Sequence, residues 1–318
     1  MNDRGLLDLM IIRIPGLKPV EQGELCKKFD REEELVRLSR RDLEALLKRP
    51  LKQFMAMDEL RSSAEKDAKA ARLWGIRWAP LVSAEYPPLL REIYDPPAVL
   101  FHRGLLPDGT KPMAAIVGTR KPHGPALRAT FDIARDLGSQ GISVVSGLAL
   151  GIDAMAHRGN LEGGGRTYAV LGSGVDEIYP SSNRNIARRI LENGGALLSE
   201  YPPGIGPQKW HFPARNRIIS ALVRGTLIAE APAGSGALIT ARFALEQGRD
   251  LWVSAAGLSS EGVTHLVSDG AKIIRSASDI LDEWGLVEHK EKDGAEAAGN
   301  ETGKALAASL ARQLTIEH

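Results

Sequence analysis

A basic segment with aromatic residues in it is the part of this sequence best suited to bind a polyanion. Residues 202–229 contain no Asp or Glu and carry four cations, Lys209, Arg215, Arg217 and Arg224. Cations without a local carboxylate favour an anionic ligand over an internal ion pair. Phe212 stands among them, and such a pattern lets a single strand stack its bases while its phosphates are neutralised. The segment therefore predicts a nucleic-acid site.

Two aromatic residues flank the start of the helix expected in this segment. Such residues more often anchor a helix in the core, and this is what we expect of Trp210. Phe212 precedes Pro213 at the helix start and is the better candidate for stacking. Asn216, one turn further along, belongs to the same predicted site.

Glycine-rich turns follow three apolar runs upstream of the basic segment. Glycine allows backbone N–H groups to approach an anion closely, and the helix after each turn adds the positive end of its dipole. A similar turn precedes a later helix. The predicted phosphate contacts in these turns are Gly118, Thr119, Arg120, Ser146, Gly147, Gly172, Ser173, Gly174, Ser235 and Gly236.

Arg120 admits a second interpretation. It lies directly on the first glycine turn, so it could pair with a carboxylate such as Glu200 or Glu230 at a neighbouring strand end instead of with phosphate. Both interpretations place Arg120 at the site.

The sequence offers no catalytic, metal or cofactor motif of the usual kinds. Asp153 and His157 share one helix face, but no third ligand is evident, so we expect Asp153 to cap backbone donors and His157 to bond within the fold. The first turn lacks Gly-x-Gly-x-x-Gly, and no acidic residue follows the second strand to bind a ribose. Ser235 is not in a nucleophile elbow. We expect a binding protein without metal or cofactor, not an enzyme.

Composition limits where such a site can lie. The 318 residues include 41 Lys and Arg against 40 Asp and Glu, a net charge of +1, so a nucleic-acid site must be a local patch. Cys26 is the only cysteine, which argues against a disulfide framework and agrees with a reducing compartment. No apolar run approaches the length of about 20 residues that spans a bilayer. We expect a cytoplasmic protein without a membrane partner.

Short apolar runs alternate with helix-length segments from residue 113 onward. This pattern indicates an α/β fold with a doubly wound, mostly parallel sheet, which binds ligands at the carboxyl ends of its strands. The expected strands are residues 114–117, 142–145, 167–171, 196–199, 226–231 and 251–254.

The chain divides into four predicted parts. They are a small all-α domain over residues 1–78 that resembles a SAM or helix-hairpin-helix unit, a proline-rich linker packed on the core over 79–112, the nucleic-acid-binding domain over 113–285, and a flexible tail with a short C-terminal helix over 286–318.

With these residues in view, the chain resembles the DNA-processing protein A family (DprA, also called Smf). The resemblance spans roughly residues 80–285 and is highly specific. The matching motifs are residues 117–120 (Val-Gly-Thr-Arg), 151–157 (Gly-Ile-Asp-Ala-Met-Ala-His), 169–176 (Ala-Val-Leu-Gly-Ser-Gly-Val-Asp), 199–204 (Ser-Glu-Tyr-Pro-Pro-Gly), 212–220 (Phe-Pro-Ala-Arg-Asn-Arg-Ile-Ile-Ser) and 235–241 (Ser-Gly-Ala-Leu-Ile-Thr-Ala).

The resemblance implies an extended Rossmann domain that binds single-stranded DNA in natural transformation, forms homodimers and passes the strand to the RecA recombinase. It implies no catalytic residue. Residues 254–257 depart from the Pro-Gly pair usual in the family, which bears on the nearby dimer surface, where Leu266, Ile273 and Ile274 are candidates. The DNA contacts that it implies are the side chains of Arg120, Lys209, Phe212, Arg215 and Arg217 and the backbone of Ser146, Gly147, Gly172 and Gly174.

Two other functions fit glycine-rich strand ends. One is a nucleotide phosphoribohydrolase of the lysine-decarboxylase-like class, which needs a glutamate shortly after its glycine turn, whereas here no acid follows Gly236 before Glu246. The other is a nucleotide sensor, whose phosphate site would have the same sequence pattern.

Overall fold

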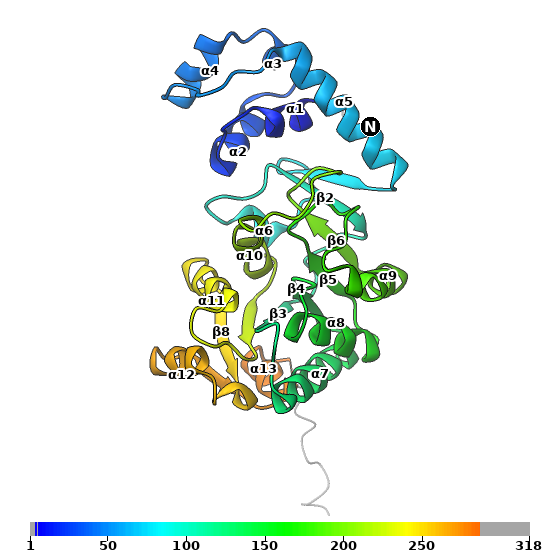
Figure 1. Cartoon of the computed structure of the whole chain (residues 1–318), viewed down its shortest axis with the longest axis vertical. Coiled ribbons are helices and arrows are strands. Elements are labelled where there is room, and N and C mark those ends of the chain that lie inside the picture. The colour runs from blue at the N-terminus through cyan, green and yellow to red at the C-terminus, as the bar shows by residue number, and fades with distance from the viewer. Residues whose placement is uncertain (1–3, 5, 287–318) are drawn as a thin grey trace, which may run out of the picture. The chain divides into compact units, whose positions relative to one another are not determined.

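The computed structural model describes residue 4 and residues 6–286 of the chain (Figure 1). Residues up to Ala277 form one compact unit, and a second unit begins at Ser278. Of the second unit the structure describes the helix α13 (Ala277–Glu283). The helix expected near the C-terminus lies outside the described residues.

A sheet of nine strands forms the centre of the first unit, in the order β1-β2-β6-β5-β4-β3-β7-β8-β9. The pairs from β6 to β9 are parallel, and β1 and β2 add an antiparallel edge. The doubly wound fold class is confirmed. The strands are β1 (Arg77–Pro80), β2 (Val99–Gly104), β3 (Met113–Val117), β4 (Ser143–Ser146), β5 (Thr167–Val170), β6 (Ala196–Ser199), β7 (Gly225–Ile228), β8 (Asp250–Ser254) and β9 (Lys272–Ile274).

The strands that the sequence analysis identifies are those buried on both faces. β3, β5, β6 and β7 are buried along their whole length, which is why each is a continuous apolar run. β1 and β2 lie at the start of the proline-rich segment and within it. Neither was predicted, because prolines at this density disfavour a strand. β9 has only three residues and is partly exposed, too short a pattern to recognise.

Five helices precede the sheet in the part of the chain that the structure describes. Arg13 on α1 donates to Asp67 on α5 (2.7 Å), which joins the first helix to the last of this set. Leu7, Met10, Leu35 and Leu60 are buried in their shared core. The helices are α1 (Leu7–Arg13), α2 (Pro19–Lys28), α3 (Glu32–Val36), α4 (Arg40–Leu47) and α5 (Met57–Leu73).

Crossover helices cover both faces of the sheet. Parallel crossovers are right-handed, so the helices that connect strands in the direction of β6 cover one face of the sheet, and those that connect strands in the direction of β9 cover the other. Figure 1 shows α7, α8 and α9 on one side of the sheet and α10 and α11 on the other. The remaining helices are α6 (Pro88–Arg91), α7 (Gly124–Ser139), α8 (Ile152–Glu162), α9 (Arg184–Glu192), α10 (His211–Ala221), α11 (Gly236–Glu246) and α12 (Glu261–Ser268), with 3-10 turns at Ser181–Asn183 and Ala255–Gly257.

No helix in residues 6–286 is both long enough and apolar enough to cross a membrane.

The strand order reverses between β3 and β7, so the carboxyl ends of these strands form the switch point at which such folds bind ligands. Thr119 N, just after β3, donates to Glu230 O, just after β7 (2.8 Å). A Cβ at Gly118 would lie 2.6 Å from Ile152 Cγ1 and 2.8 Å from Glu230 O. Glycine at 118 is therefore needed for this close approach of two strand ends and α8.

His157 on α8 is buried and bonds within the fold, as expected. Thr167 Oγ1 donates to Val144 O (2.6 Å), so it accepts from His157 Nδ1 (2.7 Å), and this fixes the neutral tautomer of the ring. Burial, and secondarily the charge of Arg215, lowers the pKa of His157 to about 3. The folded protein therefore resists protonation of this ring.

We expect the substitution His157→Asn to flatten the acid limb of the stability profile. The pKa of His157 in the folded protein lies below the ordinary value of 6.5. The free energy of unfolding therefore falls as the pH drops from 6.5 toward 3, by up to about 1.4 kcal/mol per pH unit. Asparagine keeps a donor near the Nδ1 position but does not titrate. Urea unfolding at a series of pH values measures the slope. His265→Asn, at an exposed site, is the control, and equal slopes for wild type and His157→Asn would contradict the assignment.

Candidate functional site

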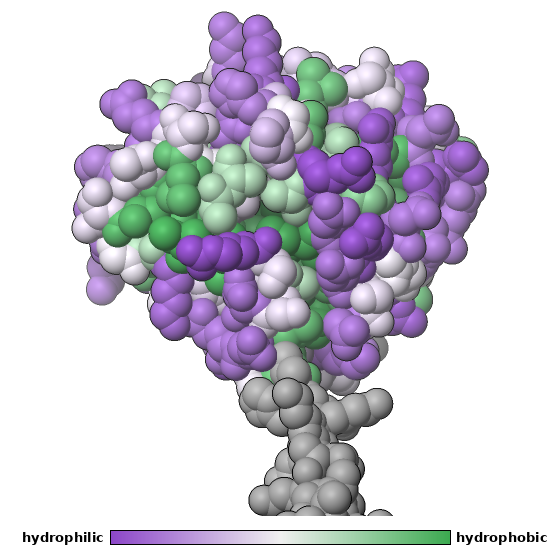
Figure 2. All heavy atoms as spheres, turned by 90° about the horizontal axis from the view of Figure 1, so that it is seen from below, coloured by the Kyte–Doolittle hydropathy of each residue, from purple (hydrophilic) through white to green (hydrophobic). Residues whose placement is uncertain are grey.

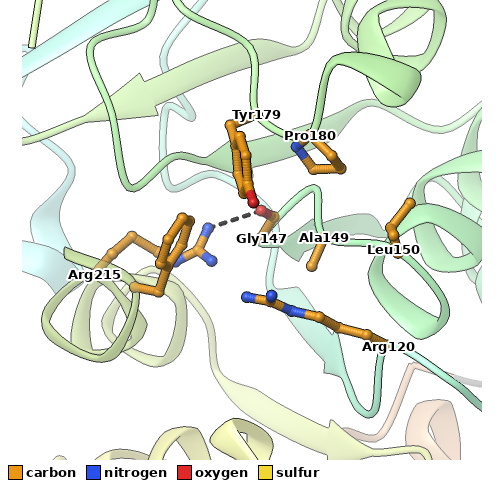
Figure 3. Close-up of a pocket in the computed structure, with 8 residues that line it drawn as sticks. Arg120, Gly147, Ala149, Leu150, Tyr179, Pro180 and Arg215 are labelled. Carbon is orange, nitrogen blue, oxygen red and sulfur yellow. Dashed lines mark hydrogen bonds between the residues drawn. The ribbon is translucent and has the colours of Figure 1, made fainter. Parts of the chain in front are cut away.

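A small pocket lies at the carboxyl ends of β3, β4 and β5, closed on one side by α10 (Figure 3). Its volume is about 50 Å³. The loops after the three strands and two residues of α10 contribute its lining, which consists of Arg120, Gly147, Ala149, Leu150, Tyr179, Pro180, Phe212 and Arg215. The structure thus brings residues from the first two glycine turns next to two residues of the basic segment.

Arg215 forms the floor of this pocket and is 5% exposed. Its Nη1 donates to Gly147 O (2.9 Å) after β4 and to Val170 O at the end of β5. A Cβ at Gly147 would lie 2.6 Å from Nη2, so glycine is needed for the guanidinium to fit. Burial lowers the pKa of Arg215 to about 10; nearby Asp153 opposes this shift and Arg120 adds to it. The group stays cationic at neutral pH while its donors hold two strand ends.

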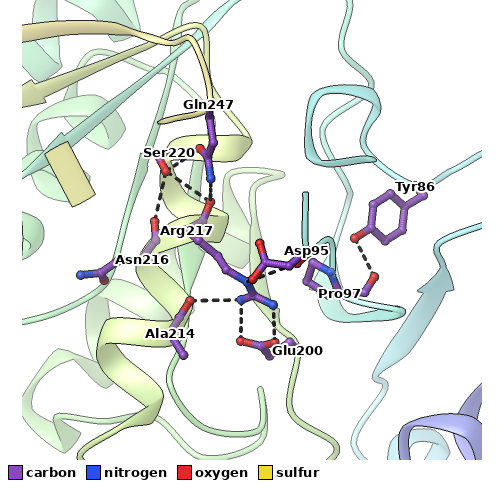
Figure 4. A network of polar contacts seen from close by, with 9 residues as sticks. All are labelled: Tyr86, Asp95, Pro97, Glu200, Ala214, Asn216, Arg217, Ser220 and Gln247. Atoms are coloured by element: carbon purple, nitrogen blue, oxygen red, sulfur yellow. Dashed lines mark hydrogen bonds and ion pairs between the residues drawn. The ribbon is translucent and has the colours of Figure 1, made fainter. Parts of the chain in front are cut away.

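Arg217 faces another part of the fold (Figure 4). Its guanidinium donates to both carboxylate oxygens of Glu200 (2.8 Å each) and to Asp95 Oδ2 (3.0 Å). Although burial opposes the charge, these carboxylates raise the pKa of Arg217. The expectation that cations of the basic segment lack carboxylate partners is wrong for Arg217, because the fold supplies partners distant in sequence. Arg224 likewise lies 3.9 Å from Asp250.

Arg120 is exposed and lies over an aromatic ring. Its Cζ is 5.5 Å from the centre of the Phe212 ring, within the range of a cation–π contact. The carboxylates considered as alternative partners are engaged elsewhere: Glu200 binds Arg217, and Glu230 accepts from His123 N (3.0 Å) and contacts His123 Nδ1 (2.7 Å). Across the described residues, Arg120 forms no ion pair, so the pairing interpretation is wrong.

Phe212 belongs to a small aromatic cluster at the pocket. Its ring lies against Gly172, where a Cβ would be 2.9 Å from Phe212 Cδ1. Tyr179 lies 5.6 Å from it between ring centres, at an interplanar angle of 40°, and is 47% exposed. Tyr179 was not among the predicted site residues, because it lies far from the basic segment in the sequence. The feature that could have identified it is its position in a tyrosine–proline pair after a glycine turn.

Trp210 is not the core anchor that its position suggested. It is 68% exposed and touches only the edge of His211 among described aromatic rings, with ring centres 5.9 Å apart. His211 takes the anchoring role: it is buried and stacks on Tyr201 at 3.9 Å. Lys209 is also exposed, and in the described part of the chain its ammonium has no carboxylate partner. Lys209 and Trp210 therefore extend the exposed surface before α10, although neither lines the pocket.

Three amides of the glycine turns are not free, contrary to the prediction. Gly147 N donates to Asp153 Oδ2 (3.1 Å), so Asp153 caps the loop as expected. Gly174 N donates to Ile205 O (2.7 Å), and Thr119 N is bound to Glu230 O. The amides of Thr119, Gly147 and Gly174 are thus satisfied within the protein. The glycines serve close packing, and an anion at this site would meet side chains first.

The serines and Asn216 also have internal partners. The hydroxyls of Ser146 and Ser173 are buried and donate to Ile116 O and Glu177 O (2.7 Å each). Ser235 caps α11 by accepting from Ala237 N (3.3 Å), and Asn216 Nδ2 donates to Gly236 O (3.1 Å). These residues link elements around the site, and a contact of theirs with a nucleic acid stays a prediction.

No group of three or more His, Cys, Asp or Glu side chains that could hold a metal ion occurs in the described residues.

Comparisons with known proteins confirm the resemblance. Residues 78–285, from within β1 to just after α13, match the family model described as DNA recombination-mediator protein A. The DNA processing protein DprA of Bacillus subtilis (strain 168) is 40% identical over 252 residues, 74% of this chain and 84% of that protein. The X-ray structure of DNA processing protein A from Streptococcus pneumoniae has a TM-score of 0.67 at 32% identity and covers 88% of this chain and 94% of that chain.

A structure of DNA processing protein A from Helicobacter pylori, reported for its single-stranded DNA binding mode, has a TM-score of 0.58 at 31% identity. It covers 65% of this chain and 95% of that chain.

We expect Glu200→Gln to destabilise the fold by about 3 kcal/mol, because removing one charge from a buried ion pair leaves the other charge poorly compensated. The side chains of Arg217 and Glu200 are 4% and 14% exposed. The matched control is Glu192→Gln, which breaks the exposed pair with Arg188 and should cost less than about 1 kcal/mol. Urea unfolding of both variants tests this. Similar losses for the two variants would show that the Arg217 pair does not hold α10 in place.

Proposed function

This chain belongs to the DNA recombination-mediator protein A family, and we propose that it is a DNA-processing protein that binds single-stranded DNA at the pocket between β3, β4, β5 and α10. The ligand is taken from the relative of Helicobacter pylori, whose structure is reported for its binding of single-stranded DNA. The binding residues proposed below are the cations and aromatic rings at this pocket and on the exposed surface just before α10.

The contact between Arg120 and Phe212 is the observation that carries the proposal. The guanidinium is exposed and without an ion pair in the described residues, and the ring below it is half-buried. A strand that stacks a base near Phe212 would bring its phosphate within reach of Arg120. Stacking together with neutralisation gives binding that tolerates any sequence and weakens with salt.

The exposed and the buried residues of the basic segment have different roles in this proposal. Arg120 and Lys209 neutralise phosphates, and Phe212, Tyr179 and Trp210 offer surfaces for bases. Arg215 adds positive potential at the pocket floor. Arg217, whose donors are taken by Glu200 and Asp95, positions α10 and does not contact DNA.

The pocket argues against the two other functions. Its volume of about 50 Å³ is well below the roughly 300–1,000 Å³ of sites that enclose small ligands, which favours an open strand over a single nucleotide. None of the eight lining residues is a carboxylate, whereas the phosphoribohydrolase needs a glutamate near its glycine turn. Binding is therefore favoured over cleavage.

We further propose that the bound strand is protected and passed to the RecA recombinase in natural transformation. This step rests on family membership. An open site suits it, because a strand held on a surface by stacking and phosphate contacts can be transferred without release from an enclosed cavity.

We propose that the chain forms a homodimer through its hydrophobic surface near α12. Figure 2 shows hydrophobic residues gathered on the face seen from below, bordered by hydrophilic side chains. Leu266 on α12 and Ile273 on β9 are partly buried at the edge of the core. Ile274, the third candidate, is 2% exposed and belongs to the core instead.

We expect Arg120→Ala to weaken binding of all single-stranded sequences alike and to reduce the slope of log affinity against log salt by about 0.7, the value for one phosphate contact on a single strand. Phe212→Ala should cost about 1–3 kcal/mol of binding free energy with the slope unchanged, because it removes stacking without removing charge. Fluorescence anisotropy with labelled oligothymidylate and a mixed-sequence oligonucleotide across salt concentrations measures both.

The control for this experiment is Arg135→Ala. Arg135 lies late in α7 and pairs with Asp132 and Asp136, toward the opposite edge of the sheet. An unchanged slope for Arg120→Ala, or an equal effect of Arg135→Ala, would remove Arg120 from the site.

We expect Leu266→Glu to convert the dimer to a monomer, because it places a charge in an apolar interface. Light scattering after size-exclusion chromatography gives the mass, and thermal unfolding verifies that the variant is folded. The control is Leu73→Glu, at a residue 80% exposed at the end of α5. A folded Leu266→Glu variant with the mass of the wild-type dimer would place the interface elsewhere.

A further inference from the structure

Three exposed arginines lie on the outer surface of consecutive crossover helices. They are Arg128 on α7, Arg158 on α8 and Arg184 on α9, and we call them the helix belt. None of them lines the pocket, and the sequence analysis gives none of them a role. Their common feature is a cation on the solvent side of a helix that covers the sheet.

The helix belt is a continuous surface. α8 packs against both α7 and α9, and Figure 1 shows α8 between the two. Because crossover helices run antiparallel to their strands, their amino-terminal ends lie at the carboxyl edge of the sheet, where the pocket is. Neighbouring helix axes are about 8–10 Å apart, so the helix belt extends over about 20 Å.

One end of the helix belt is fixed to the rim of the pocket. The side chain of Asn183, just before α9, donates to Leu148 O (2.9 Å) and Ala149 O (3.2 Å) in the loop after β4. Ala149 lines the pocket, as does Tyr179 on the other side of the 3-10 turn. Arg184 follows Asn183 directly, so a strand that leaves the pocket past Tyr179 meets Arg184 next.

The arginines of the helix belt have no acidic partner in the described residues. Acids occur one turn further along two of the helices, but Asp132 pairs with Arg135 (3.1 Å), and Glu162 forms no ion pair with Arg158. On α9 the acid is Glu192, which pairs with Arg188 (2.6 Å). The three guanidiniums are therefore available to an anion from solution.

The placement of Arg184 does not serve helix stability. The positive end of the helix dipole favours acids in the first turn and cations in the last. α9 begins with Arg184, has no acid in its first turn, and ends with the acid Glu192. A cation at the start of α9 costs helix stability, and a polyanion bound there would account for it.

We propose that single-stranded DNA leaves the pocket across the helix belt, where Arg184, Arg158 and Arg128 bind successive phosphates. The proposal rests on the proposed function, since it extends the same strand beyond the pocket. It predicts a dependence on strand length that the pocket alone does not produce. A short oligonucleotide fills the pocket only, and a longer one also reaches the helix belt.

The test compares oligothymidylates of about 6 and about 30 nucleotides, lengths within and beyond the usual range of one single-strand site. The variant carries Arg128→Ala, Arg158→Ala and Arg184→Ala together. We expect it to bind the long strand at least about tenfold more weakly, with a salt slope lower by about 2, the value for three lost phosphate contacts. Binding of the short strand should be unchanged.

Two further variants separate charge from structure and position. Replacement of the same three residues by lysine should restore the salt slope on the long strand, because the charges remain. Replacement of Arg40, Arg61 and Arg242 by alanine removes three exposed, ion-paired arginines on other helices and should affect neither strand.

The outcomes distinguish this inference from the proposed function. If the alanine variant of the helix belt binds the long strand like wild type while Arg120→Ala weakens both lengths, the helix belt is overturned and the pocket stands. Equal weakening of both lengths by the helix-belt variant also overturns the inference, because the effect would then act on the pocket. If wild type binds neither strand, both proposals fail.

Discussion

Two buried guanidiniums on one helix set the geometry of this protein's site. Arg215 donates to carbonyls at the ends of β4 and β5, and Arg217 binds the carboxylates of Glu200 after β6 and Asp95 in the proline-rich segment. α10 is thereby attached to three neighbouring strand ends. A helix fixed in this way places Phe212 at the pocket and leaves Lys209 and Trp210 exposed before it.

This arrangement separates groups that build the site from groups that can bind a ligand. The glycine turns pack the strand ends, and their amides at Thr119, Gly147 and Gly174 already have acceptors. Exposed charge remains at Arg120, and aromatic surface remains at exposed Tyr179 and half-buried Phe212. A rigid, internally satisfied framework with cations and rings on its surface suits a strand of any sequence, because phosphates and base faces are common to all nucleotides.

The sequence predicted the parallel part of the sheet but not the role of each residue. Buried parallel strands leave continuous apolar runs, so β3 to β8 were predicted, whereas β1 and β2 border the proline-rich stretches and β9 has only three residues. The glycine turns and the basic segment predicted a site, and the fold brings residues of both to one pocket. The role of Arg217 depends on carboxylates brought from Asp95 and Glu200 by the tertiary fold, and the exposure of Trp210 depends on His211 taking the anchoring position; neither is visible in local sequence.

The proposed binding mode requires that bases lie on the aromatic residues around α10. Photocrosslinking of an oligonucleotide that contains 5-iodouracil, followed by mass spectrometry of the adducts, measures where the bases lie. We expect adducts at Phe212, Tyr179 or Trp210, and their loss when unlabelled single-stranded DNA competes. Adducts found only at exposed aromatic residues away from the pocket, such as Phe54, Trp74 or Tyr94, would contradict it.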